Sequence, residues 1–126
     1  MNKPASTPKE VHAIVVAAMG ASVVVTVAGK VIASTAKALM LDDTSGGRTV
    51  YIPRKDVDMA LLKRSAHVTH DPDMGDRVYY SIPAGGARSR DAAWSFETPH
   101  PAIAAIKDYL AFAPSRVDAI VEWPAD

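Results

Sequence analysis

The sequence lacks cysteine, carries no excess of either charge and has no hydrophobic run as long as a membrane-spanning helix. The absence of cysteine excludes disulfides, thiolate zinc ligands and cysteine nucleophiles. Fourteen lysines and arginines balance fourteen aspartates and glutamates, whereas proteins that neutralise many phosphates usually carry a basic excess. We therefore do not expect nucleic acid as a partner.

The longest uncharged run, Ala13 to Ala28, reads AIVVAAMGASVVVTVA. A spanning helix needs about 20 apolar residues, so this run is too short. It is rich in β-branched valine and is interrupted by Met-Gly-Ala-Ser, which is typical of two strands joined by a turn. We predict two strands here, no membrane partner and a cytoplasmic location.

Short apolar segments separated by turn residues continue along the chain. Ala28-Gly29-Lys30 predicts a tight hairpin turn, and two segments have helical spacing of apolar residues: RKDVDMALLKRS (residues 54–65) and the stretch from Pro101 to Leu110. The pattern predicts a mainly β (α+β) fold with two short helices. We expect residues 1–11 to form a flexible N-terminal arm and residues 12–126 to form a single β-rich domain.

The stretch THDPDMGDRVYYSI, from Thr69 to Ile82, contains a histidine and three aspartates ahead of two tyrosines. Imidazole and carboxylate groups bind metals, but His67 and His70 would point to opposite faces of an extended segment. Asp71-Pro72-Asp73 also has the composition of a turn, in which aspartate bonds to its own backbone and proline fixes φ. We predict a polar turn, with no metal and no cofactor.

Several blocks, in order, resemble one family: GKVIASTAKALML, VYIPRKDVDMALL, HVTHDPDMGDRVYYSIPAGG and AAWSFETPHPAIAAIKDYLAF. It is domain of unknown function family 427, also labelled nucleotidyltransferase-like. The resemblance implies two small antiparallel sheets packed at a steep angle, as a β-tent. The family's characteristic turn, Cys-Pro-aromatic-Lys-Gly, corresponds here to Asp71-Pro72-Asp73-Met74-Gly75, so its three reactive positions are replaced. Nucleotidyl transfer uses a Gly-Ser turn followed by paired carboxylates; this sequence lacks that motif, and whether it is an enzyme stays open.

Six residues are candidates for ligand binding: Arg54, His70, Asp71, Asp73, Tyr80 and Trp94. The guanidinium of Arg54 suits a carboxylate or phosphate, although an ion pair with Asp43, Asp56 or Glu97 would also explain it. His70 is a possible proton carrier, because the unperturbed imidazole of a histidine changes its charge near neutral pH. Tyr80 and Trp94 would form the walls of a pocket, or would belong to the core.

These observations suggest a small domain that binds a polar or anionic small ligand in a cleft between its sheets. The alternative is a non-catalytic domain that docks another protein or forms a homodimer through exposed strand edges.

Overall fold

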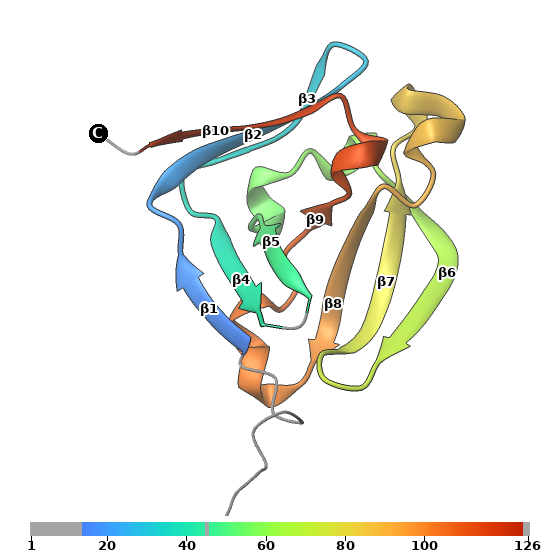
Figure 1. Cartoon of the computed structure of the whole chain (residues 1–126). Coiled ribbons are helices and arrows are strands. Elements are labelled where there is room, and N and C mark those ends of the chain that lie inside the picture. Colours follow the sequence, from blue (N-terminus) through green and yellow to red (C-terminus); the bar gives the residue numbers. More distant parts are fainter. Residues whose placement is uncertain (1–13, 45, 125–126) are drawn as a thin grey trace, which may run out of the picture.

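The structure is a computed structural model, and it describes residues 14–44 and 46–124 (Figure 1). Its strands form three small antiparallel sheets. The first contains β1 (Ile14–Ala18), β4 (Leu39–Asp43) and β5 (Gly47–Tyr51), and the second contains β10 (Ala119–Pro124), β2 (Ala21–Val27) and β3 (Lys30–Thr35). The third has the order β6 (Lys63–Asp71), β7 (Gly75–Ser81), β8 (Ala93–Pro99) and β9 (Ala111–Phe112).

The valine-rich run forms β1 and β2 as predicted, on two different sheets. In β2, Val23, Val25 and Val27 are buried and alternate with half-buried residues, because successive side chains of a strand point to opposite faces. The predicted hairpin turn joins β2 to β3. Ala28 and Gly29 both have positive φ, 52° and 76°, which is the backbone that the tightest hairpin turns require.

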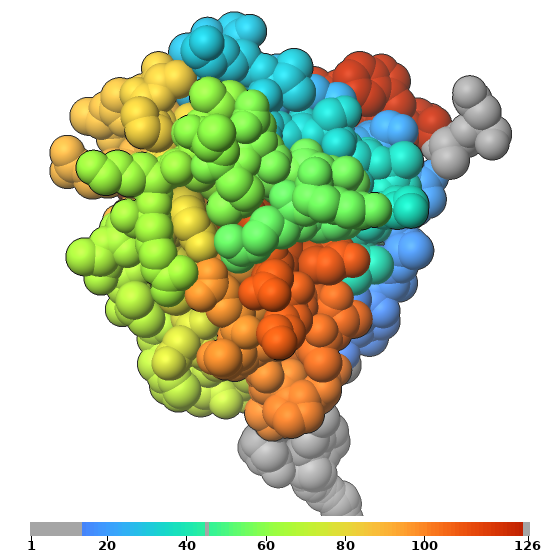
Figure 2. Space-filling model, turned by 180° about the vertical axis from the view of Figure 1, so that it is seen from behind, coloured from blue at the N-terminus to red at the C-terminus, as the bar shows by residue number. Residues whose placement is uncertain are grey.

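The three sheets surround two connected groups of buried side chains. The larger lies between the sheet of β2 and the sheet of β7 and β8, and it includes Val25, Ile52 and Tyr80. The smaller lies between β4, β5 and β8, and it includes Tyr51, Met74 and Phe96. In Figure 1, β10 and β2 lie across the top of the molecule, and β4 and β5 face β8 below them. Seen from behind, the segment after β5 lies at the centre of the visible face, with the segment around residues 101–112 below it (Figure 2).

The helix predicted at residues 54–65 is wrong. The chain forms two 3₁₀ turns, η3 (Arg54–Asp56) and η4 (Met59–Leu61), and then enters strand β6. Tertiary contacts override the helical spacing, because Val57 bridges to Ala33 and the Asp58 amide donates to the Ile32 carbonyl at 2.8 Å. Asp56, in η3, accepts a hydrogen bond from the Thr35 hydroxyl at 2.6 Å.

The other helices are also short 3₁₀ segments: η5 (Pro83–Ser89), η6 (Pro101–Ile106) and η7 (Pro114–Arg116). The helix predicted from Pro101 corresponds to η6, where Ile103 and Ile106 are buried as the spacing indicated. The mainly β fold is confirmed, although the described strands form three small antiparallel sheets where the resemblance implied two. The predicted arm at residues 1–11 lies outside the described residues. None of the described helices is long and apolar enough to cross a membrane.

Candidate functional site

Arg54 is the centre of a polar cluster that also contains Arg64, Tyr80, Ser95 and Glu97. Its Nε donates to the Asp108 carbonyl at 3.0 Å, its Nη1 to the Tyr80 hydroxyl at 3.2 Å and its Nη2 to the Ser95 hydroxyl at 3.2 Å. Nη2 also lies 3.3 Å from a carboxylate oxygen of Glu97. The half-buried guanidinium of Arg54 therefore joins η3 to β7, β8 and the segment after η6.

Glu97 is the anion of this polar cluster. It accepts from the Tyr80 hydroxyl at 2.9 Å and from Nη1 of Arg64 at 3.0 Å and 3.1 Å. Burial alone would raise the pKa of Glu97, but the hydrogen bonds from Tyr80 and Arg64, with the charges of Arg64 and Arg54, outweigh it and hold this pKa below 4.5. The same hydrogen bond raises the pKa of Arg64. The ion pair with Glu97 was one of the three predicted for Arg54.

A cavity of about 520 Å³ opens between the first and second sheets. All three sheets line it: β2 and β10 supply Val25, Ile120 and Glu122, β4 and β5 supply Met40, Arg48 and Val50, and β8 and β9 supply Trp94 and Phe112. The inward direction follows from register, because Val25 pairs with Ile120 and Met40 pairs with Val50. Paired residues share a face of their sheet, so two apolar faces meet across the cavity.

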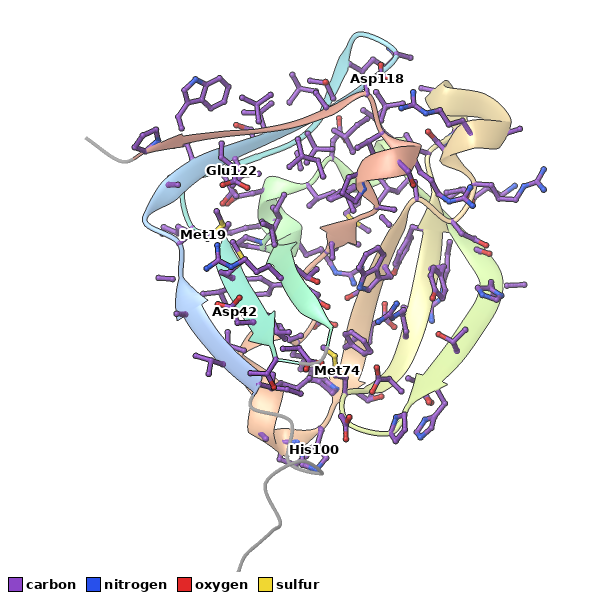
Figure 3. The ribbon with its side chains drawn as sticks, in the orientation of Figure 1. Met19, Asp42, Met74, His100, Asp118 and Glu122 are labelled. Carbon is purple, nitrogen blue, oxygen red and sulfur yellow. The ribbon has the colours of Figure 1, made fainter. Side chains whose placement is uncertain are left out.

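Three charged side chains, those of Arg48, Asp118 and Glu122, also line the cavity. Arg48 is exposed and its Nε donates to Asp42 at 2.9 Å, and Asp118 is held by Arg88 and by the Ala28 amide. The side chain of Glu122 forms no hydrogen bond or ion pair with the residues that the structure describes. In Figure 3, Glu122 points from β10 towards β4. The cavity thus combines apolar walls with a carboxylate that has no fixed partner.

The predicted ligand residues do not converge on one cleft. Tyr80 pairs with Ala93 and Tyr79 pairs with Trp94, so Tyr80 and Trp94 lie on opposite faces of the third sheet. Arg54 and Tyr80 belong to the polar cluster, whereas Trp94 lines the cavity. The indole Nε1 of Trp94 donates to the Tyr51 hydroxyl at 3.3 Å, which fixes the ring in the cavity wall.

The turn of THDPDMGDRVYYSI connects β6 to β7. Asp71 Oδ1 accepts from the amides of Asp73 and Met74 at 2.8 Å and 3.2 Å, as predicted for a polar turn. Met74 is buried and points towards β5 (Figure 3), where it packs with Tyr51 and Phe96. Gly75 has φ of 116°, and a Cβ there would lie 2.9 Å from the Thr98 carbonyl. The turn is therefore specified by Asp71, Met74 and Gly75.

The model of the family described as domain of unknown function, DUF427, matches residues 15–123. The chain belongs to this family. The resemblance seen in the sequence is thus confirmed over nearly the whole chain. Comparison with curated proteins finds no match.

Within this DUF427 domain, the histidines near the turn are engaged separately. His70 Nδ1 lies 2.8 Å from Asp76 Oδ1, and both side chains are exposed. The His67 ring packs against Tyr79 with ring centroids 4.6 Å apart. Asp73 lies near His100 in a shallow depression beside β1. Among residues 14–44 and 46–124, no three histidine, aspartate or glutamate side chains are grouped so as to hold a metal ion.

Two residues of this DUF427 domain were missed by the sequence reasoning. Glu122 lies in β10, where alternation along Val121-Glu122-Trp123 would have placed it opposite the exposed Val121 and Trp123. Arg77 shares a face with Tyr79, because they are two apart in β7. Its partners on β8 required the register: Arg77 pairs with Phe96 and lies diagonally from Trp94.

Proposed function

We propose that this protein binds a small molecule that has a largely apolar body and a charged group, in the cavity between its sheets. The observation that carries the proposal is the cavity of about 520 Å³ lined by side chains from all three sheets. Small-molecule sites in proteins span about 300–1,000 Å³ and have apolar walls with a few polar groups. The cavity matches both properties.

The composition of the cavity sets the chemistry of this ligand. Val25, Val50, Ile120 and Phe112 offer no hydrogen bonds, so they favour an apolar or aromatic body. The indole of Trp94 offers a flat surface for such a body. The sequence predicted a polar or anionic ligand bound by Arg54 and Tyr80. Neither residue lines this cavity, whose walls are largely apolar, so we extend the ligand to one that also has an apolar body.

The second candidate function is self-association. β6 is an edge strand of nine residues, most of them exposed, and the outer face of β10 carries Val121 and Trp123 at 40% and 50% exposure. An unpaired edge and an apolar face both favour pairing with another chain. Sedimentation equilibrium at several protein concentrations distinguishes this function from ligand binding, since only self-association depends on protein concentration.

Filling the cavity tests the first proposal. We expect 1-naphthylacetate to raise the melting temperature, because a ligand at 100 times its dissociation constant stabilises a fold by about 2.7 kcal/mol. Ile120→Phe should abolish the increase by occupying the cavity. Val121→Phe, the next residue on the outer face of the same strand, should retain it.

An unchanged response of Ile120→Phe would contradict the proposal, as would the absence of any response in the unaltered protein. The melting temperatures of both variants without ligand provide the check that each still folds. A response that weakens in Val121→Phe and not in Ile120→Phe would place the ligand on the outer face of β10 instead.

A further inference from the structure

Arg77 is a half-buried cation without a conventional partner. It lies on β7 with its guanidinium carbon 5.0 Å from the ring centroid of Trp94 and 5.4 Å from that of Phe96. Its Nε is buried, and none of its guanidinium nitrogens forms a hydrogen bond with the residues that the structure describes. Contact with aromatic faces stabilises the cation but leaves its N–H groups without acceptors. A buried donor in this state lowers stability unless something else accepts from it.

The surrounding groups do not neutralise this charge. Asp71 is the carboxylate nearest in register on this face, two residues beyond Thr69, which pairs with Arg77. One oxygen of Asp71 already accepts two backbone amides of the turn, and Asp71 forms no ion pair with Arg77. The hydroxyl of Tyr51 stays protonated, since burial raises its pKa despite the hydrogen bond from Trp94 and the charge of Arg77.

Trp94 connects this cation to the cavity. The indole lies in the cavity wall and also contacts the guanidinium of Arg77. By contrast, Arg54 has an acceptor for Nε, Nη1 and Nη2, and Arg48 is paired with Asp42. Arg77 itself does not line the cavity, but it contacts the cavity wall through Trp94, and its buried Nε has no acceptor among the described residues.

We propose that the cavity ligand carries a carboxylate or phosphate group and that Arg77 binds this group at the edge of Trp94. This inference rests on the proposed function and narrows its ligand class to aromatic or apolar acids. The guanidinium offers paired N–H donors that match the two oxygens of such an anion. The rings of Trp94 and Phe96 hold the guanidinium in place before the anion arrives, which reduces the entropy lost on binding.

Nuclear magnetic resonance of the ¹⁵N-labelled full chain tests the inference, with Trp123→Phe as background so that the remaining indole signal is that of Trp94. Sodium phosphate, compared with sodium chloride at equal ionic strength, reports on Arg77 alone through its Nε–H signal. 1-Naphthylacetate and its neutral analogue 1-naphthylacetamide report on the cavity through the Trp94 indole signal. Arg77→Gln and Arg77→Lys remove or reshape the cation, and Arg90→Gln is the control at an exposed arginine.

We expect phosphate, and not chloride, to shift the Arg77 signal until it saturates. 1-Naphthylacetate should bind roughly tenfold more tightly than the amide, as for a charge-assisted hydrogen bond. Arg77→Gln should abolish this preference, Arg77→Lys should reduce it, and Arg90→Gln should leave it unchanged.

Two failures would be distinguishable. If both naphthyl compounds bind equally and phosphate does not move the Arg77 signal, the role of Arg77 is overturned while the cavity proposal stands. If neither naphthyl compound moves the Trp94 signal, the cavity proposal fails, and a phosphate response would then leave an anion site at Arg77 and overturn its link to the cavity.

Discussion

The charged side chains of this protein differ in whether their hydrogen bonds and ion pairs are formed with other described residues. Every nitrogen of Arg54 has an acceptor in the polar cluster, and Glu97 accepts from Tyr80, Arg54 and Arg64. Such a cluster positions elements, because removing one member leaves the others without partners. Arg77 and Glu122 differ from it, since neither forms an ion pair with a described residue.

Glu97→Gln tests the stabilising role of the polar cluster. The loss of the carboxylate leaves Arg54 and Arg64 without their shared anion, so we expect the free energy of unfolding at pH 7 to fall by about 1–3 kcal/mol. Urea denaturation measures this change. Glu122→Gln is the matched control and should change the free energy little, because Glu122 is exposed and has no described partner.

The pH dependence of Glu97→Gln has a definite sign. Because folding lowers the pKa of Glu97 below 4.5, its stabilisation is present above pH 4.5 and is lost as the pH falls through the folded pKa. The difference between the unaltered protein and Glu97→Gln should therefore shrink as the pH falls below 4.5. A difference that is constant from pH 7 to pH 3 would mean that the charge of Glu97 contributes nothing.

At the scale of elements, the turn between β6 and β7 depends on the hydrogen bonds of Asp71 to the backbone and on the close approach of Gly75 to the Thr98 carbonyl. Gly29 and Gly75 both have positive φ, but only at Gly75 would a Cβ meet a backbone oxygen, that of Thr98, at 2.9 Å. Gly29→Ala should cost about 1 kcal/mol for the left-handed backbone alone. Gly75→Ala should cost about 2 kcal/mol more, because β8 must move to make room. If urea denaturation gave equal losses in the free energy of unfolding for the two variants, the expected clash with β8 would be contradicted.

The same elements show how far the sequence predicts this fold. The valine-rich run and the turn residues predicted β1, β2 and the hairpin turn that follows, and Asp71-Pro72-Asp73 predicted the polar turn, since these depend on neighbours along the chain. Residues 54–65 were misassigned because their conformation depends on contacts with β3 and β7, which are distant from them in the sequence. The cavity and the position of Arg77 against Trp94 depend on strand register, so periodicity could not reveal them.

At the scale of the whole molecule, three small sheets surround two groups of buried side chains. Two of them turn apolar faces towards each other, and the third closes the gap with Trp94 and Phe112. Small domains usually fill such a gap with side chains, since protein interiors are close-packed. The open volume between these sheets is therefore the feature of the architecture on which the proposed ligand binding rests.

The most direct test of the central claim is the set of nuclear Overhauser effects between bound 1-naphthylacetate and the methyl groups of the protein. The account predicts contacts from the naphthalene protons to Val25, Val50 and Ile120, which line the cavity. It predicts none to Val31 and Val121, which are exposed on the outer face of the second sheet. Contacts to Val31 or Val121 with none to the cavity methyls, or no contacts to any methyl, would contradict the claim that this cavity is the ligand site.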